Sequence, residues 1–451
     1  GVGSGCGLAG GRRETPLATT DPVELEAVGV NATEENRLPT RIEETHWDLL
    51  VVGAGPAGAS CAIEAAANGL KVLLVDAKTF PRPKVCGGCL NRSAWELLER
   101  LGVAMHLRNL GATTIDTMEL RCGSREGRWR VGSPNRPAMH AVSRWTMDPV
   151  LIDRAKACGV TWLPGTEARL VGRPDASRRV ALVQGGRVVQ EVDAYCVAIA
   201  SGLASKVAGN IPGLGSQVLA SSRVGLGCLT NGPTEGIPTG LLQMVVGKEG
   251  YVGMVQVEGG RINAAAAVDR DALRMAGSPE ALIGRILLQG GIQAEILNQM
   301  APWHGTPALT RQPNRRADHR LLLIGDAAGY LEPFTGEGMS WALRSGILAA
   351  RLAIESGTKW SEAIEQRWER IWKEAIGEHR AACSGLARFV RHPRLLQAGL
   401  AICPWVPGIA QRLVNSVADR SCASLPKTIS GALLDPVTVS RLEPSWQGSE
   451  G

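Results

Sequence analysis

The chain has 451 residues, of which 44% are hydrophobic and 20% charged, so it can bury a large core and divide into two or three lobes. Its formal net charge of +6 is small for this length, and no run of Lys and Arg is interleaved with aromatic residues, so nucleic acid is not expected as a partner. The 11 cysteines are scattered and odd in number, which fits a reducing compartment better than a disulfide framework.

The N-terminal residues 1–46 are polar and acidic without sustained periodicity, and we expect them to be disordered. They contain no apolar core of a secretory signal, so a cytoplasmic location is the default expectation. The most apolar late stretch, Leu395 to Ala410, is shorter than the roughly 18 residues of a membrane span, so a transmembrane protein is not indicated.

The stretch from Asp48 to Asp76 predicts a strand, a helix and a second strand that together hold a dinucleotide. Its outer segments are continuously apolar, and small residues lie between them. A GxGxxG motif marks the turn into the helix, where glycine allows a tight turn, approach of a pyrophosphate and close helix packing. Its glycines are Gly53, Gly55 and Gly58. Asp76 ends the second strand, where a carboxylate holds a ribose diol and repels a 2′-phosphate, so the cradle predicts FAD or NAD rather than NADP.

A loop rich in proline and glycine, FPRPKVCGGCL, precedes a helix predicted at residues 93–101. Cys86 and Cys89 form a CxxC pair with three interpretations: backbone that lines a cofactor, a structural loop, or a redox disulfide. No second Cys or His pair follows at zinc-finger spacing, so no metal site is expected.

The middle of the chain predicts mainly β structure. Short apolar runs alternate with glycine and proline, with a helix at 144–156 and one or two helices at 273–300. Residues 187–192 and 194–200 predict two separate strands, and the second ends in a glycine turn at Gly202. The β-rich block at 215–310 predicts a substrate lobe.

A second strand-turn-helix unit begins at Leu321. A buried strand at 321–324 presents Gly325 and Asp326, and a helix is predicted at 339–356. Asp326 could accept hydrogen bonds from a polyol chain or, alternatively, could simply be a helix N-cap. Gly336 and Gly338 would let backbone N–H groups approach a planar ring, and the helix N-terminus would favour an anionic ring such as reduced flavin.

Residues 357–420 are predicted to be helical, followed by a loose tail at 421–451. Around residues 388–410 an apolar segment is flanked by Arg388, Arg391 and Arg394. It fits either a buried capping helix or contact with a membrane surface.

Three motifs together, GAGPAG with Asp76, FPRPKVCGG and GDAAGYLEPFTGEG, resemble the flavoprotein hydroxylase and geranylgeranyl reductase superfamily. The resemblance covers residues 48–346 and implies an α/β fold: a Rossmann-like FAD-binding βαβ domain with an inserted β-sheet substrate lobe and a helical C-terminal region. The predicted division is 47–214 for the FAD-binding domain, with part of the substrate lobe near 104–142, then 215–310 for the substrate lobe, 311–356 for the second FAD-binding part and 357–420 for the C-terminal helices.

The resemblance also implies the FAD contacts by position. The GxGxxG glycines would contact the pyrophosphate, Asp76 the adenosine ribose and Asp326 the ribityl chain. Arg144 matches an arginine that lies along the FAD. The resemblance also implies FAD contacts near the ring by Cys86, Gly87, Gly88, Pro333, Gly336 and Gly338. Two further implied contacts, Gly202 and Gly325, lie at the ends of strands.

Departures from the superfamily pattern narrow the function. The pair Ser201-Gly202 stands where Asp-Gly is usual, which removes a carboxylate. The Trp-x-Trp-x-Ile-Pro segment of halogenases is absent, which disfavours halogenation. Of the Tyr-x-Trp-x-Phe segment of archaeal prenyl reductases only Tyr251 remains, and we predict that it contacts substrate. No second GxGxxG follows Gly58, since Gly213-Leu214-Gly215 continues as Ser216-Gln217-Val218, which disfavours a disulfide reductase with its own NAD domain.

The combined prediction is an FAD-dependent oxidoreductase whose flavin is reduced by NADH or NADPH and then acts on an apolar small molecule. The second half-reaction is either reduction of a prenyl-type double bond or hydroxylation. No catalytic residue is assigned, because lone histidines such as His106, His140 and His304 are more often structural. Two alternatives are a non-catalytic FAD-binding scaffold and a thiol oxidoreductase that uses Cys86 and Cys89.

Overall fold

The structure is a computed structural model, and it describes Gly1 and residues 42–418 apart from 134–136, 173–174, 204–206, 208, 210, 212, 333, 335 and 406. The predictions for residues 2–41, for the tail from 421 and for Pro333 lie outside these described residues. Disorder was predicted as far as residue 46, but residues 42–46 are ordered. Ile42 exchanges two hydrogen bonds with the side chain of Gln190, and His46 already begins the first strand.

The first layer is a sheet whose central strands are parallel, in the order β19-β20-β11-β1-β2-β8. The strands of this sheet are β1 (His46–Val52), β2 (Val72–Val75), β8 (Thr161–Leu163), β11 (Arg187–Ile199), β19 (Ala317–Asp318) and β20 (Leu321–Leu323), with β9 (Glu167–Val171) and β10 (Arg178–Gln184) attached to β11. Strands buried on both faces read as continuous apolar runs, which is why the sequence predicted β1, β2 and β20. Their carboxyl ends meet at one edge of the sheet.

The prediction of two strands at 187–192 and 194–200 was wrong, because β11 is a single strand of 13 residues. Its first part forms a hairpin with β10, and its last part pairs with β1 and β20. Asp193 lies where the two parts meet, and its carboxylate accepts hydrogen bonds from Ser177 and Arg179. The polar residue therefore interrupts the apolar run without ending the strand.

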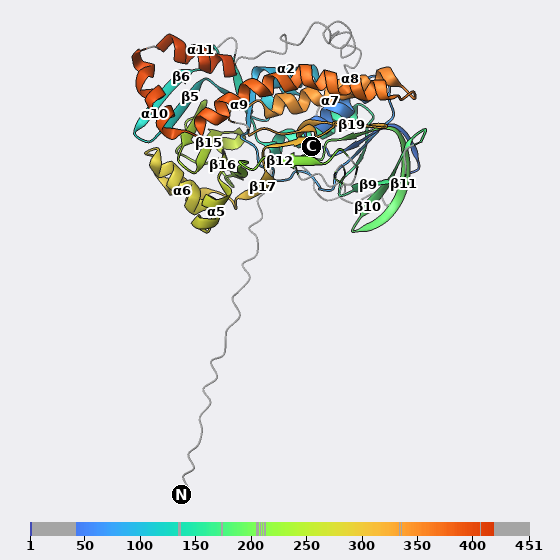
Figure 1. The fold of residues 1–451 in the computed structure, drawn as a ribbon, viewed down its shortest axis with the longest axis horizontal. Helices are drawn as coiled ribbons and strands as arrows, with labels where there is room; N and C mark the ends of the chain where they lie inside the picture. The colour runs from blue at the N-terminus through green and yellow to red at the C-terminus, as the bar shows by residue number, and fades with distance from the viewer. Residues whose placement is uncertain are drawn as a thin grey trace. The chain divides into compact units, whose positions relative to one another are not determined.

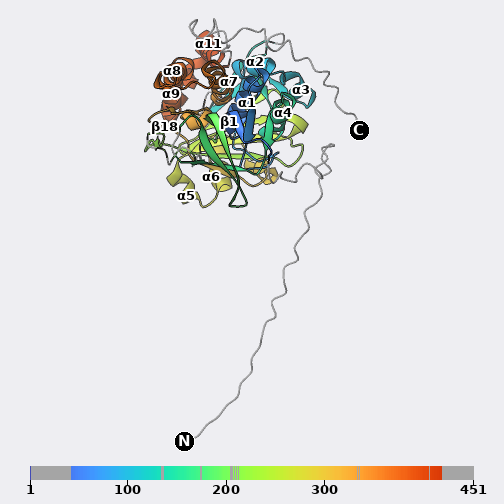
Figure 2. The same ribbon diagram turned by 90° about the vertical axis from the view of Figure 1, so that its right-hand side faces the viewer.

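Three helices cover this sheet: α1 (Pro56–Ala67), α4 (Arg144–Ala157) and α7 (Gly338–Ser356). Figure 2 shows α1 beside β1, with α4 and α7 nearby. Helices α1 and α7 touch closely at Gly346, where a Cβ atom would lie 2.1 Å from the carbonyl oxygen of Ala57. The hydroxyl of Ser60 also donates to the carbonyl oxygen of Leu343 across this contact. The predicted helices at 144–156 and 339–356 are thus confirmed to within one residue.

The second layer is a seven-stranded sheet in the order β17-β13-β16-β15-β14-β5-β6. Its strands are β5 (Thr117–Cys122), β6 (Arg125–Arg130), β13 (Val224–Leu229), β14 (Leu241–Val246), β15 (Gly250–Gln256), β16 (Ile262–Val268) and β17 (His304–Ala308). One face packs on α5 (Arg270–Ala276) and α6 (Pro279–Gln289) through side chains such as Val245, Val252 and Ile286. Because side chains alternate along a strand, Met244 and Tyr251 point to the opposite face.

Smaller elements join the two layers. A three-stranded sheet contains β3 (Cys89–Asn91), β4 (Thr113–Ile115) and β7 (Met139–Ala141), next to α2 (Arg92–Arg100) and α3 (Ala104–Asn109). A two-stranded sheet contains β12 (Ser216–Val218) and β18 (Arg311–Pro313). Helix α2 confirms the prediction at residues 93–101.

The C-terminal helices are α8 (Glu362–Trp372), α9 (Glu378–Val390), α10 (Pro393–Ile402) and α11 (Pro407–Ala418). Trp368 and Trp372 of α8 lie one turn apart and are both buried in the core. Figure 1 shows α10 and α11 next to β5 and β6, which they contact. None of the helices in the described part of the chain is long and apolar enough to cross a bilayer.

Candidate functional site

A cavity of about 2140 Å³ begins at the carboxyl edge of the parallel sheet and continues along the face of the seven-stranded sheet. Ligand pockets usually measure about 300–1,000 Å³, so this cavity has room for a dinucleotide and a second molecule. It brings together most of the residues that the sequence predicted. Those that line it are Gly53, Gly55, Asp76, Cys86, Gly87, Arg144, Gly202, Tyr251, Gly325, Asp326, Gly336 and Gly338. Gly58 and Gly88 do not line it.

The first two motif glycines shape the turn, and the third seats the helix. Gly53 has φ +105°, a conformation that favours glycine. A Cβ atom on Gly58 would lie 1.8 Å from the carbonyl oxygen of Gly53, so the helix could not pack on the turn. Gly58 therefore acts through backbone packing rather than by facing the ligand space.

The N-terminus of α1 is suited to hold an anion. Its N-cap, Gly55, has no side chain to satisfy the first N–H groups, and Pro56 occupies the first turn. Unpaired N–H groups and the helix dipole favour a phosphate at this position. Arg144 and Lys84 line the same cavity and add positive charge. These residues fit the pyrophosphate of a dinucleotide.

Arg144 is fixed by its own helix and by the neighbouring lobe. Its guanidinium donates to both carboxylate oxygens of Asp148, at 2.5 and 2.7 Å. Burial alone would lower the pKa of Arg144, but the carboxylate of Asp148 outweighs burial and the pKa is raised. The side chain therefore keeps its positive charge inside the protein.

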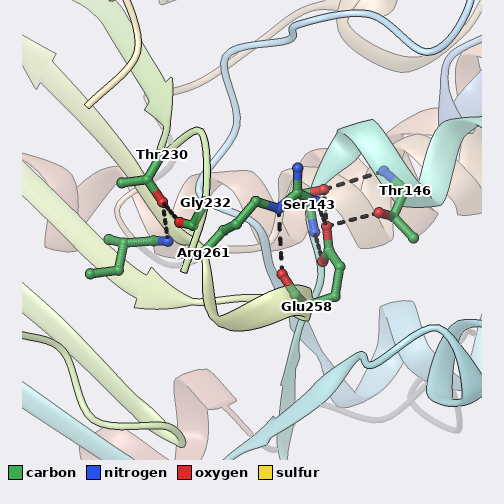
Figure 3. A network of polar contacts seen from close by, with 7 residues as sticks. Ser143, Thr146, Thr230, Gly232, Glu258 and Arg261 are labelled. Carbon is green, nitrogen blue, oxygen red and sulfur yellow. Dashed lines mark hydrogen bonds and ion pairs between the residues drawn. The ribbon is translucent and has the colours of Figure 1, made fainter. Parts of the chain in front are cut away.

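Glu258 links the seven-stranded sheet to Ser143 at the start of α4 (Figure 3), and Arg144 is the next residue of the chain. This buried carboxylate accepts hydrogen bonds from the N–H and hydroxyl of Ser143, from the hydroxyl of Thr146 at 2.8 Å and from Arg261 at 2.5 Å. The hydroxyl of Ser143 in turn caps α4 by accepting from the N–H of Thr146. The Glu258 network thereby sets the position at which Arg144 enters the cavity.

Asp76 lies at the end of β2, as predicted, with its carboxylate held by the backbone. One oxygen accepts from the N–H of Ala54 at 2.8 Å and the other from the N–H of Lys78 at 2.9 Å. A carboxylate has about four acceptor positions, so two remain for a ribose diol. The guanidinium of Arg82 lies 3.6 Å away and stacks over Phe80. The positive charge of Arg82 offsets the negative charge of Asp76, which was expected to repel a 2′-phosphate. Arg82 was not predicted from the sequence.

Asp326 and Lys84 both line the cavity and are close enough for the charge of each to affect the other. Asp326 lies in a short 3-10 turn (Gly325–Ala328) after β20, while the N-cap of α7 is Glu337, so the alternative that Asp326 caps this helix is wrong. Burial raises the pKa of Asp326, against the opposing charges of Lys84 and Arg144. Burial and then Arg144 lower the pKa of Lys84. Lys84 was also missed, although it belongs to the FPRPKVCGG motif.

The N-terminus of α7 lies at the wall of the cavity. Gly336, Gly338 and Met339 line the cavity there, and no side chain among the described residues caps the helix. The partial positive charge of a 19-residue helix favours an anionic group at this place. This arrangement suits the edge of a reduced flavin ring.

The CGG loop is anchored from behind. Gly88 turns away from the cavity, because its α-carbon faces the side chain of Asn263, which donates to the carbonyl oxygen of Cys86 at 2.9 Å. Cys86 and Cys89 are both free thiols. Burial raises the pKa of Cys89 to about 12, so little reactive thiolate forms at neutral pH. Cofactor lining by Cys86 and Gly87 suits the loop better than redox chemistry.

Tyr251 lines the far part of the cavity from β15. Its ring packs edge-on against Phe334, with centroids 5.0 Å apart. The hydroxyl is buried and has no hydrogen-bond partner among the described residues. Burial and then the charge of Glu332 raise its pKa well above the usual value, so the hydroxyl keeps its proton.

The three histidines differ in position. His304 lines the cavity, whereas His106 and His140 do not. The ring of His140 is buried and stacks on Trp95, with centroids 3.7 Å apart. In the described part of the chain no group of three or more His, Cys, Asp or Glu residues could hold a metal ion.

The far part of the cavity is apolar and lies between the seven-stranded sheet and the C-terminal helices. Gly253 faces Met244, where a Cβ atom would lie 2.7 Å from the sulfur, so glycine leaves room for the methionine. The apolar side chains of this part come from β5, β14, α9, α10 and α11: Met118, Leu120, Leu242, Met244, Leu386, Phe389, Leu396, Leu400 and Val414. The sequence did not predict that α9 to α11 close this part of the cavity.

The fold and the dinucleotide cradle define a flavoprotein, and comparisons with known proteins agree. The family described as "FAD binding domain" matches residues 46–223. A menaquinone reductase of Mycolicibacterium smegmatis is 29% identical over 377 residues, which cover 78% of this chain and 87% of that protein. A digeranylgeranylglycerophospholipid reductase of Methanosarcina mazei is 24% identical, with 73% and 81% covered. The structure of the flavin-dependent brominase Bmp2 aligns with a TM-score of 0.68 at 18% identity, covering 85% of this chain and 96% of that one.

The chain is an FAD-dependent oxidoreductase. As the sequence motifs predicted, the chain is similar in sequence to these reductases and in fold to flavin-dependent halogenases.

Proposed function

We propose that this oxidoreductase uses FAD, reduced by NADH or NADPH, to saturate a carbon–carbon double bond in a prenyl lipid. The observation that carries the proposal is the continuity of the cavity from the dinucleotide cradle to an apolar end under α9, α10 and α11. The names of the relatives support it, because one is a reductase of a quinone and the other a reductase of a geranylgeranyl lipid. The prenylated quinones combine both features and are the substrates we would test first.

The reaction adds a hydride to one carbon of the double bond and a proton to the other, while NADH or NADPH is oxidised. Bound FAD supplies the hydride once it is reduced. The chain contributes the positions: the start of α1, Arg144 and Lys84 hold phosphates, and the start of α7 favours the negative charge of the reduced ring. The apolar walls exclude water from the reacting carbons.

Tyr251 is proposed to position the substrate. Its protonated hydroxyl has no partner among the described residues and lies in the cavity wall between Phe334 and the apolar end. A hydrogen bond to a polar group of the lipid, such as a quinone carbonyl, would satisfy it. No second GxGxxG unit follows Gly58 in the sequence, so we propose that the nicotinamide reaches the flavin transiently through the same cavity.

Rapid-scan absorbance without oxygen tests the proposal. The FAD-loaded protein is reduced with NADH or NADPH and then mixed with a prenylated quinone in detergent or with dissolved oxygen. We expect bleaching of the flavin by at least one nicotinamide, followed by faster reoxidation with the lipid than with oxygen. A flavin that neither nicotinamide reduces would favour the scaffold alternative. Fast reaction with oxygen and a hydroxylated product would favour a monooxygenase.

A further inference from the structure

The outer face of α10 carries an exposed apolar stripe. Leu395, Ala398, Ile402 and Trp405 follow one another at intervals of three and four residues, so they share one side of the helix and its following turn. The exposed fractions of the large members are 57% for Leu395, 56% for Ile402 and 85% for Trp405. Leu396 and Leu400, on the other side of α10, are buried. We call the exposed set the α10 face.

Exposed apolar side chains gather at this place. Twelve large apolar side chains are strongly exposed in the described part of the chain, and four of them lie within residues 389–405. The other eight lie elsewhere in the chain, either singly, such as Met275 on α5, or as the adjacent pair Val218 and Leu219. Single exposed apolar residues need no explanation, but a cluster marks an interaction surface.

The segment 379–418, which carries the α10 face, has acidic residues at none of its positions. It contains five arginines. Arg380 and Arg391 are engaged inside the protein, where Arg391 pairs with Glu332. Arg388, Arg394 and Arg412 are exposed. Excess positive charge beside apolar side chains is complementary to a membrane that contains anionic lipids.

The α10 face also adjoins the cavity. Ile402 both lines the cavity and is exposed, and Leu396, Gly399, Leu400 and Cys403 line it from the same helix and turn. A molecule that leaves the apolar end of the cavity at Ile402 therefore emerges beside Leu395 and Trp405. Tryptophan prefers the boundary between water and the hydrocarbon of a bilayer.

We propose that the α10 face docks on the surface of a bilayer containing anionic lipids, so that a prenyl lipid enters the cavity directly from the membrane. The exposed apolar side chains and the nearby arginines are the observations that support the docking surface. Entry of substrate at this place rests on the proposed function. Since none of the described helices crosses a bilayer, the contact is peripheral.

Vesicle sedimentation of the full-length, FAD-loaded protein tests the docking surface. Vesicles of phosphatidylcholine alone are compared with vesicles that also contain phosphatidylglycerol. We expect binding to the anionic vesicles that is released near 1 M salt, where the Debye length falls to about 3 Å. The double variant Leu395→Ser with Trp405→Ser should bind at least about tenfold more weakly, since two anchors no longer insert. Arg394→Gln should bind about fivefold more weakly.

Matched controls carry the same changes elsewhere on the surface. Met275→Ser replaces a side chain that is 80% exposed on α5, and Arg285→Gln replaces an exposed arginine on α6. Both should bind vesicles as the wild type does. The proposal is overturned if the wild type ignores anionic vesicles, or if the controls lose as much binding as the α10 variants. It is also overturned if Leu395→Ser with Trp405→Ser only converts a dimer to a monomer in analytical ultracentrifugation.

Turnover separates this proposal from the proposed function. Neither Leu395 nor Trp405 lines the cavity, so their double variant should reduce a short, water-soluble prenyl substrate at the wild-type rate. When the same double bond belongs to a long-chain lipid held in vesicles, the double variant should reduce it several times more slowly than the wild type does. Vesicle binding without turnover of any prenyl substrate would support the docking surface and refute the proposed function.

Discussion

The hydroxyl of Tyr251 leads to a prediction in which stability and activity change in opposite directions. The side chain is 4% exposed, and its hydroxyl has no partner among the described residues. An unpaired buried polar group costs about 1–3 kcal/mol of stability. Tyr251→Phe removes the hydroxyl and keeps the ring against Phe334. We therefore expect the free energy of unfolding to rise by about 1 kcal/mol.

The same change should weaken the reaction. If the hydroxyl donates a hydrogen bond to the substrate, its loss removes about 1.4 kcal/mol, which is roughly a tenfold fall in kcat/KM. Because the bond is made in the bound substrate as well as in the transition state, most of the change should be a higher KM. Urea denaturation of the FAD-loaded protein and steady-state kinetics measure the two effects. Tyr195→Phe, on β11 and away from the cavity, is the matched control and should leave the kinetics unchanged.

Two results would refute this reasoning. A loss of stability in Tyr251→Phe would mean that the hydroxyl has a partner in the folded protein. A gain of stability with unchanged KM and kcat would mean that the hydroxyl does not meet the substrate.

Four further predictions concern the support of the site. Burial, followed by the charges of Arg108 and Arg92, lowers the pKa of His140 from 6.5 to about 4. Between these pH values the unfolded chain binds more protons than the folded protein does. The free energy of unfolding should therefore fall by up to about 3 kcal/mol as the pH drops from 6.5 to 4. His140→Phe, which can still stack on Trp95, should flatten this slope in urea denaturation at several pH values; an unchanged slope would contradict the assignment. Glu258→Gln should lower the free energy of unfolding by about 2 kcal/mol and speed FAD release, which flavin fluorescence measures. FAD release at the wild-type rate would show that the Glu258 network does not position Arg144. Gly346→Ala should lower the melting temperature by forcing α1 from α7, whereas Gly385→Ala, with open space around it, should not; equal melting temperatures would refute the close contact. Cys89→Ser should keep its turnover, because its thiol has a pKa of about 12, and turnover reduced to background would restore the thiol oxidoreductase alternative.

The dinucleotide unit could be predicted because its signals are local. The strands β1 and β2 are buried on both faces, so their sequences are continuously apolar, and the glycines between them are required by backbone contacts as close as 1.8 Å. Asp76 and Asp326 were predicted because each follows directly on such a strand. The carboxyl ends of parallel strands then bring them to the same cavity.

The remaining parts of the site depend on contacts between distant segments. Lys84 and Arg82 lie in an irregular loop, where no periodicity shows which way a side chain points. Helix α10 is apolar on both sides, since Leu396 faces the cavity and Leu395 faces outward, so its pattern could not separate a capping helix from a membrane contact. Gly88 lies in the predicted loop, but its α-carbon faces the side chain of Asn263, from a distant strand. Asn263 also holds the carbonyl oxygen of Cys86, so Gly88 does not line the cavity.

The mass of the product tests the central claim most directly. A prenylated quinone is incubated with the FAD-loaded protein and NADH or NADPH, and air then reoxidises any reduced ring before mass spectrometry. We expect a product that keeps two additional hydrogens for each saturated double bond. A product that returns to the mass of the substrate would show that only the ring was reduced, and a product that gains an oxygen atom would show hydroxylation; either result would contradict double-bond reduction.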